Sequence, residues 1–198
     1  DHLDYHPNME AYFLAKAGLF TRLLPPEATA VINTDDPYGA RLAGMVAQPV
    51  LRVGAAPDCD LRLMVQRYDA HGQTLRFAYK GHMYQVDLTL VGGFQAANAL
   101  LALGLVLATG ADADDAIAAM AGLVGVRGRM QLAATRANGA PVFVDYAHTP
   151  AAVETALKAL RPHVMGRLIV VLGAGGDRDK TKRPLMGKAA AENADVVF

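Results

Sequence analysis

The sequence predicts an α/β protein with two domains. Apolar runs of strand length alternate with longer segments in which apolar residues recur at helical spacing. Near the C-terminal end, a strand-like run enters a glycine-rich turn, and a helical pattern follows that turn. Alternation of this kind favours right-handed crossovers and a parallel sheet, with ligands at the carboxyl ends of the strands.

The first part of the chain is expected to start with a helix over 7–20, with Asn8 as its N-cap. A strand over 29–34 and a turn over 35–39 follow. From 49 to 90 the apolar and polar residues alternate in three runs separated by short turn sequences, which predicts antiparallel hairpins; the runs are 61–68, 74–80 and 83–90. Helical periodicity then returns over two segments, 94–110 and 112–123.

The last third of the chain has a different pattern. Residues 131–146 read as a hairpin, and 149–160 read as a helix in which Thr149 precedes Pro150 as an N-cap. A buried parallel strand is expected over 167–173, and after the glycine turn come a further helix and a strand at 194–198. We therefore expect a domain boundary near Gly128, with residues 1–127 in one domain and 128–198 in the other.

Composition excludes several classes of protein. The 198 residues are 53% hydrophobic and 19% charged with zero formal net charge, which is typical of a globular protein and gives no general attraction to nucleic acid or membranes. The single cysteine, Cys59, excludes an internal disulfide framework. No apolar run is long enough to span a membrane. We expect a cytoplasmic protein. We also expect an internal fragment of a longer chain, because the sequence has no initiator methionine and ends inside a strand pattern.

The turn "VLGAGGDRDKTKRPLMG", residues 171–187, fits neither of two well-known phosphate-binding motifs. Both the dinucleotide fingerprint and the P-loop require glycine where Arg178 stands. Two interpretations remain for the turn. It holds an anionic ligand with its glycines and cations, or it is a charged loop in contact with solvent.

Lys16 is unusual for the first helix. One side of the predicted helix contains Met9, Phe13, Lys16 and Phe20, so the lysine interrupts an otherwise apolar face. Either its stem packs while the ammonium reaches water, or the amine is partly buried and available for chemistry.

Six segments together resemble the Mur ligase family. They occur in the family's order and approximate spacing, and they are "DHLDYHPNMEAYFLAKAGLF", "VINTDD", "GGFQAANALLA", "GVRGRMQ", "VFVDYAHTPAAVETAL" and "GAGGDRDKTKRPLMG". The resemblance implies an α/β fold that comprises the end of the central ATPase domain and the first half of a Rossmann-like C-terminal domain. The family's upstream "GTNGKT" P-loop and downstream "DNPR" motif are not among these residues, so this chain alone is expected to be inactive.

The resemblance is strongest to the branch that adds the third amino acid to UDP-N-acetylmuramoyl-L-alanyl-D-glutamate in peptidoglycan synthesis. It implies that ATP phosphorylates a carboxylate and that an amine then attacks the acyl phosphate. It also implies Mg²⁺, with His2 as a metal ligand and with Lys16 carbamylated, so that the carbamate supports a second magnesium ion. For His2 the alternative is a surface or helix-capping histidine.

Four further residues are expected to contact the nucleotide: Asn98, Arg129, Asp145 and His148. Asn98 matches a family asparagine near adenine, and Arg129 matches a family arginine near the phosphates or ribose. The apolar run before Asp145 places this carboxylate at the carboxyl end of a strand, where it can accept hydrogen bonds from ribose hydroxyls, with Tyr146 and His148 beside it. Gln95 stands where the family usually has asparagine. Helix-surface or linker roles are the alternatives for Asn98 and Arg129.

Arg178 matches the arginine that holds a carboxylate of the incoming amino acid, which is usually meso-diaminopimelate and otherwise L-lysine. A planar guanidinium suits that carboxylate because it donates two parallel hydrogen bonds. The implied partners are the UDP-linked dipeptide, ATP and a diamino acid, and the enzyme is expected to be monomeric. A folylpolyglutamate-synthase-like or cyanophycin-synthetase-like ligase and a non-catalytic nucleotide-binding module remain alternatives.

Overall fold

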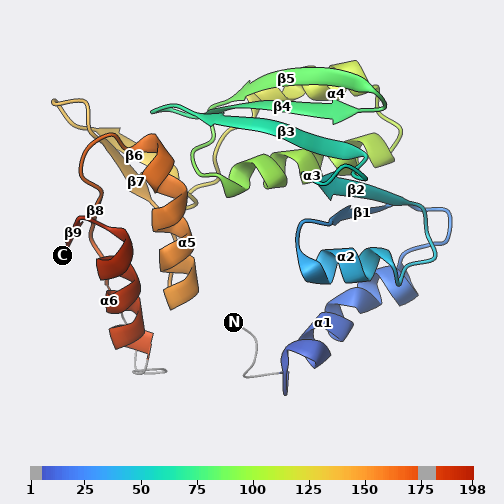
Figure 1. The fold of residues 1–198 in the computed structure, drawn as a ribbon, viewed down its shortest axis with the longest axis horizontal. Coiled ribbons are helices and arrows are strands. Elements are labelled where there is room, and N and C mark those ends of the chain that lie inside the picture. Colours follow the sequence, from blue (N-terminus) through green and yellow to red (C-terminus); the bar gives the residue numbers. More distant parts are fainter. Residues whose placement is uncertain (1–5, 174–181) are drawn as a thin grey trace. The chain divides into compact units, whose positions relative to one another are not determined.

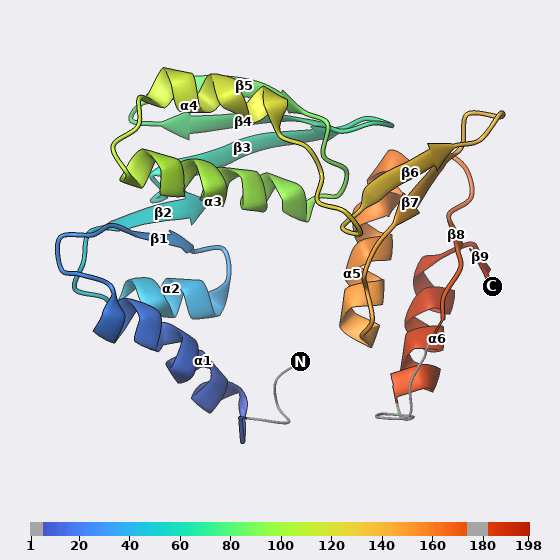
Figure 2. The same ribbon diagram turned by 180° about the vertical axis from the view of Figure 1, so that it is seen from behind.

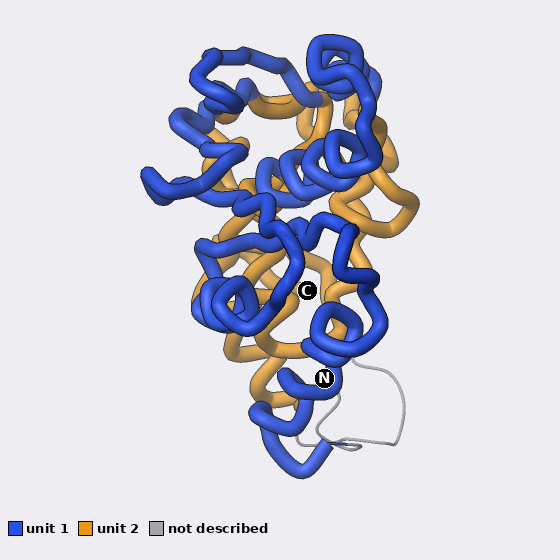
Figure 3. Tube along the Cα trace, turned by 90° about the vertical axis from the view of Figure 1, so that its right-hand side faces the viewer, with its two compact units in different colours: residues 1–67, 74–88, 96–122 blue, residues 68–73, 89–95, 123–198 orange. Residues whose placement is uncertain are grey.

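The computed structural model describes residues 6–173 and 182–198 and contains two compact units. The first unit comprises residues 1–67, 74–88 and 96–122, and the second comprises 68–73, 89–95 and 123–198 (Figure 3). Two segments of the second unit therefore lie in sequence between parts of the first: 68–73 connects two strands, and 89–95 connects a strand to a helix. The domain limits 1–127 and 128–198 remain a prediction.

The first unit begins with helix α1, Met9–Gly18, which continues as a π-helical turn, Leu19–Leu23. The side chain of Asn8 accepts a hydrogen bond from the backbone N–H of Ala11 at 2.9 Å, which confirms the predicted N-cap. Strand β1, Ala30–Asn33, follows as predicted.

The predicted turn over 35–39 is wrong, because helix α2, Pro37–Ala43, begins there. The carboxylate of Asp36 caps it by accepting from the N–H groups of Tyr38 and Gly39, and Pro37 occupies the first helical turn. An Asp-Pro pair is typical both of turns and of helix starts, which explains the error.

Five strands form the sheet of the first unit in the order β1-β2-β3-β4-β5, which is also their order along the chain. Their bounds are β2 Val50–Gly54, β3 Leu61–Tyr68, β4 Gln73–Tyr79 and β5 His82–Leu88 (Figure 1). The two-residue turn between β4 and β5 has positive φ at Lys80 (48°) and Gly81 (82°), the backbone of a tight antiparallel hairpin. The predicted β3–β5 hairpins are therefore present.

Strand β2 departs from the predicted antiparallel section. It pairs in parallel with β1 over four residue pairs, and in parallel with β3 at only Val53↔Leu61 and Gly54↔Arg62. The connection over 55–60 is too short for the helical crossover that an extended parallel pair needs, so the second pairing stays brief.

Helices α3, Phe94–Ala108, and α4, Ala113–Ala119, lie on the same face of this sheet (Figure 2). Gly104 lets α3 approach closely, because a Cβ there would lie 2.8 Å from Cγ1 of Val31 and 3.2 Å from Cδ2 of Leu51. Leu61, Leu75 and Phe77 of the strands and Leu100 of α3 are almost completely buried and belong to the core of this unit.

The second unit contains the predicted hairpin and the predicted strand–helix alternation. Strands β6, Gln131–Thr135, and β7, Pro141–Val144, are antiparallel, and α5, Pro150–Leu160, starts at the predicted cap Thr149. Strands β8, Ile169–Val170, and β9, Val196–Val197, pair in parallel, with α6, Lys182–Asn193, before β9.

The core of this unit lies between α5, α6 and one face of β8. Its buried residues are Val153, Leu157, Leu168, Met186, Ala189 and Ala190. The strand expected over 167–173 is confirmed as parallel, but it is limited to Ile169–Val170. Its expected burial is wrong on one face, since Ile169 is 51% and Val171 is 81% exposed. Alternate residues of the strand face α5 and α6, and the others face away from them.

Candidate functional site

A pocket of about 270 Å³ lies within the second unit. Its walls come from 70–71 between β3 and β4, from 89–95 between β5 and α3, and from 124–132 leading into β6, together with Phe143 of β7. The polar side chains that line it are His71, Thr89, Gln95, Arg129 and Gln131. A concave site with apolar walls, several amide or hydroxyl groups and one cation suits a planar ligand with polar edges.

The turn before β6 sets the position of Arg129. Gly128 has φ +68° and Met130 has φ +48°, and left-handed backbone is unfavourable for a methionine. The N–H of Gly128 donates to Oε1 of Gln131 at 2.8 Å, and the N–H of Met130 donates to Oδ2 of Asp145 at 2.9 Å. Met130 is buried while Arg129 is exposed, so this turn presents the guanidinium at the pocket.

Asp145 lies directly after the end of β7, where the sequence predicted a ligand-facing carboxylate. Oδ1 accepts from the N–H of Ala147 at 2.9 Å, and Oδ2 accepts from Met130. Each carboxylate oxygen has two lone pairs, so Asp145 keeps the capacity to accept further hydrogen bonds.

Arg129, Tyr146 and His148 form a cluster of neighbouring side chains. The guanidinium carbon of Arg129 lies 5.2 Å from the centre of the Tyr146 ring, and the ring of His148 lies 5.0 Å from that of Tyr146. Nδ1 of His148 is 3.0 Å from the backbone O of Tyr146. The structure thus brings Arg129, Asp145 and His148 together, from segments that are separated in the sequence.

Gln95 and Asn98 lie on the first turns of α3. Gln95 lines the pocket, and its N–H donates to the backbone O of Gly92 at 3.0 Å. Asn98 is exposed one turn further along the helix and does not line the pocket. The residue that departs from the family pattern is therefore the one at the pocket.

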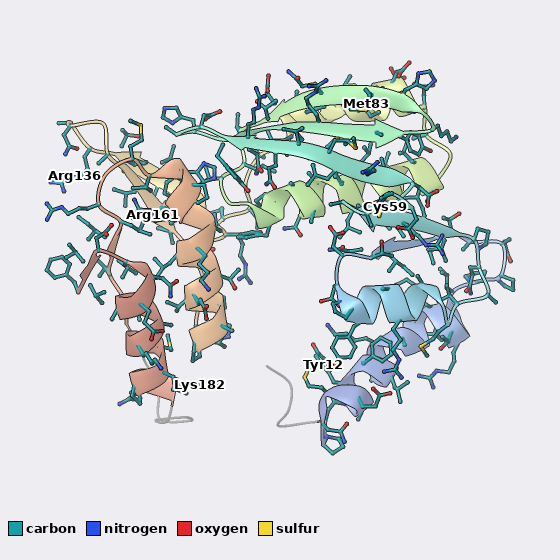
Figure 4. All side chains as sticks on the ribbon, in the orientation of Figure 1. Tyr12, Cys59, Met83, Arg136, Arg161 and Lys182 are labelled. Carbon is teal, nitrogen blue, oxygen red and sulfur yellow. The ribbon has the colours of Figure 1, made fainter. Side chains whose placement is uncertain are left out.

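Lys16 does not interrupt a buried stripe. It is exposed, and its Nζ lies 4.7 Å from the centre of the Tyr12 ring; Figure 4 labels Tyr12 on α1. The buried positions of α1 are Phe13, Ala17 and Gly18, whereas Met9 is 45% exposed. The predicted apolar stripe is confirmed at Phe13 and wrong at Met9 and Lys16, because the buried side of α1 includes Ala17 and Gly18 instead.

His2 and Arg178 lie outside the described residues, as do Asp177, Asp179 and Lys180. Within residues 6–173 and 182–198, no three His, Cys, Asp or Glu side chains gather as a metal site. No helix in that part of the chain is long and apolar enough to cross a membrane.

The shifted pKa values belong to two ion-paired carboxyl groups and one half-buried phenol, none of which lines the pocket. The Arg41 guanidinium, bonded to both carboxylate oxygens of Glu10 at 2.7 Å, lowers the pKa of that carboxyl. The N–H of Leu168 and the Arg161 guanidinium lower the pKa of Asp195. Burial, with Asp114 nearby, raises the pKa of Tyr84.

A larger pocket of about 450 Å³ in the first unit contains none of the predicted site residues. Asp60, Arg62 and Lys80 line it. Two of these polar groups have hydrogen-bond partners: Oδ2 of Asp60 accepts from the N–H of Arg52 at 2.7 Å, and Nε of Arg62 donates to the backbone O of Ala55 at 3.3 Å.

The sequence does not predict His71 or Gln131 as pocket residues. His71 lies in "DAHGQ", residues 69–73, one of the short turn sequences that separate the predicted strands. An aromatic or imidazole side chain in a turn is a weak signal by itself, and only the tertiary structure shows which turns border the same cavity.

Comparison with known families gives matches over most of the chain. The Mur ligase middle domain matches residues 1–106, and the Mur ligase glutamate ligase domain matches residues 128–198. The two matches follow the order that the sequence motifs predicted.

Several curated relatives match the whole chain. The UDP-N-acetylmuramoyl-L-alanyl-D-glutamate–2,6-diaminopimelate ligase of Zymomonas mobilis is 48% identical over 201 residues, and that of Caulobacter vibrioides is 45% identical over 201 residues. In both cases the match covers 100% of this chain and 41% of the relative. The chain thus spans about two-fifths of the length of these relatives.

Solved structures agree with these matches. A ligase of the same name superimposes with a TM-score of 0.73 at 34% identity, covering 100% of this chain and 41% of that one. The folylpolyglutamate synthase of Mycobacterium tuberculosis, complexed with ADP, gives a TM-score of 0.69 at 28% identity. That match covers 92% of this chain and 40% of the synthase. The chain shares its fold with the MurF ligase of Thermotoga maritima, at a TM-score of 0.77 and 22% identity. That match covers 100% of this chain and 46% of the MurF chain. With α/β architecture, motif order and both domain matches in agreement, the chain belongs to the Mur ligase family.

Proposed function

We propose that this chain is part of an ATP-dependent ligase that joins meso-diaminopimelate to UDP-N-acetylmuramoyl-L-alanyl-D-glutamate. The main support is the 48% identity, over the whole chain, to a relative whose name states these substrates. The lower identity of 28% to a folylpolyglutamate synthase makes a folate substrate the weaker candidate. The proposal includes a monomeric enzyme in the cytoplasm, where ATP is available.

The pocket of the second unit is the proposed site for the base and ribose of ATP. Gln95 and Gln131 supply amides for the polar edge of a base, and Asp145 retains lone pairs for ribose hydroxyls. Arg129 places a cation at the same pocket, where it would hold the phosphates. Two relatives in this fold were solved with ADP, which supports a nucleotide as the ligand.

The proposed reaction has two steps. The terminal carboxylate of the dipeptide attacks the γ-phosphorus of ATP and releases ADP, and the amine of the diamino acid then attacks the acyl phosphate and releases phosphate. Magnesium would neutralise charge on the phosphoryl oxygens, held by His2 and by carbamylated Lys16. The donors fit this ion, because a carbamate supplies oxygen ligands and the exposed Lys16 amine is accessible to carbon dioxide.

Kinetics of the full-length enzyme test this proposal. Arg129→Ala is expected to raise the KM for ATP about tenfold, through the loss of a charge-assisted contact, and to change the KM for diaminopimelate less than about twofold. Arg136→Ala is the matched control, since Arg136 lies at the β6–β7 turn away from the pocket lining (Figure 4). An equal rise in both KM values for Arg129→Ala would contradict the assignment.

The role proposed for Arg178 requires the opposite selectivity. Arg178→Lys keeps the charge but loses the two parallel hydrogen bonds to a carboxylate, so the KM for diaminopimelate should rise far more than that for ATP. Equal effects on both substrates would indicate a general role in the loop.

A further inference from the structure

His163 is a buried histidine that the proposed reaction does not use. It ends the 3-10 turn Arg161–His163 after α5, and only 9% of its surface is exposed. Nδ1 lies 2.6 Å from the backbone O of Asp69, and the backbone N–H of Gly92 donates to Nε2 at 3.2 Å. The edge of the ring packs against Tyr68 at 5.0 Å between centres. One imidazole therefore joins two connections distant in sequence, both within the second unit.

These partners indicate the tautomer of the ring. The N–H of Gly92 can only donate, so Nε2 must carry a lone pair. The O of Asp69 can only accept, so Nδ1 must carry the proton. The two partners therefore assign His163 as the Nδ1–H tautomer.

Both connections held by His163 are walls of the pocket. In the first connection, the carboxylate of Asp69 accepts from the N–H of His71 at 2.7 Å, and the N–H of Asp69 donates to the O of Gly72 at 3.1 Å. His71 and Ala70 line the pocket from this turn.

In the second connection, the O of Gly92 accepts from the N–H of Gln95 at 3.0 Å and from Nε2 of Gln73 at 3.1 Å. Gln73, which is 1% exposed, also donates to the O of Leu90 at 2.8 Å. Thr89, Leu90, Val91 and Gln95 line the pocket from this side.

We propose that His163 is a positioning residue that holds the 69–72 turn and the 89–93 connection in place as two walls of the nucleotide pocket. With both walls fixed in advance, binding need not order them, which favours affinity. The identity of the ligand rests on the function proposed above, whereas the clamp itself depends only on the His163 contacts.

Three variants of the full-length enzyme separate the two bonds. His163→Phe keeps a ring and removes both. His163→Gln places a carbonyl near the Nε2 position and can still accept from Gly92, and His163→Asn places an amide near the Nδ1 position and can still donate to Asp69. Hydrogen exchange of peptides covering 69–72 and 89–93 measures each wall, and a peptide covering Gly110, whose N–H bonds to Leu107, is the control.

His163→Phe should accelerate exchange in both peptides about threefold to tenfold, as expected for losing one hydrogen bond each, and leave the Gly110 peptide unchanged. In His163→Gln, exchange should stay slow only in the 89–93 peptide, and in His163→Asn it should stay slow only in the 69–72 peptide. Unchanged exchange in the Phe variant would overturn the clamp. If that variant does not fold, identical exchange patterns in the Gln and Asn variants would overturn it.

Kinetics then test the link to the nucleotide. The KM for ATP should rise about threefold to tenfold in His163→Phe, while the KM for diaminopimelate and kcat change less than about twofold. Faster exchange with an unchanged KM for ATP would uphold the clamp and refute the nucleotide assignment of the pocket. An unchanged KM and unchanged exchange would refute the positioning role.

Discussion

The carboxylate of Asp145 accepts a hydrogen bond from the backbone N–H of Met130 at 2.9 Å, and Met130 has a left-handed backbone with φ +48°. Asp145, which follows β7, thus stabilises the unfavourable turn that precedes β6. Because the turn carries Arg129, the same contact connects backbone conformation to the proposed site.

Asp145→Asn should destabilise the protein. Only one of the two side-chain atoms can still accept, so the N–H of Met130 or of Ala147 loses its partner, at a cost of about 1–3 kcal/mol. Urea unfolding measures the change, with the exposed Asp58→Asn as a control for loss of charge. Equal unfolding midpoints for the two variants would show that the contact contributes little.

Gly92→Ala should also be destabilising. Gly92 has φ +106°, and a Cβ there would lie 3.2 Å from Cε1 of Phe94, so backbone strain of about 1–2 kcal/mol adds to steric strain. Gly139→Ala is a matched control, since Gly139 has φ +82° with no atom within 4 Å of the added Cβ. The loss of thermal stability should be larger at Gly92, and similar losses would remove the steric argument.

Asp195 should make stability depend on pH at the acidic end. Its pKa is lowered in the folded state, so the ionised form stabilises the fold above the unfolded pKa, and this contribution disappears as the pH falls through the folded pKa. Arg161, labelled in Figure 4, bonds to Asp195 at 2.8 Å. Asp195→Asn should lower the urea midpoint at pH 7. The midpoint of this variant should also decrease less than that of the unchanged protein when the pH falls below about 4. A decline identical to that of the unchanged protein would exclude Asp195 as a cause.

Lys16→Ala should abolish most ligation by the full-length enzyme without unfolding it. Lys16 is exposed, so its truncation should change stability by less than about 0.5 kcal/mol. Added short-chain carboxylates should restore part of the activity by replacing the carbamate. Unaltered turnover at low bicarbonate would show that Lys16 only packs against Tyr12.

The sequence alone was sufficient for the elements with strong local signals. Asn8 and Thr149 were identified as caps because a short polar side chain before a helical pattern has a local hydrogen-bonding role. The β3–β5 hairpins followed from alternation and turn residues, and the family followed from motifs in a fixed order.

Features that depend on distant contacts required the tertiary structure. Burial on α1 was misjudged because periodicity gives the spacing of a stripe and not the side that faces the rest of the unit. The parallel pairing of β2 depends on β1, and the role of His163 depends on carbonyl and N–H groups 94 and 71 residues away. Local preferences determine which elements form, whereas long-range packing and hydrogen bonds determine which of their residues meet.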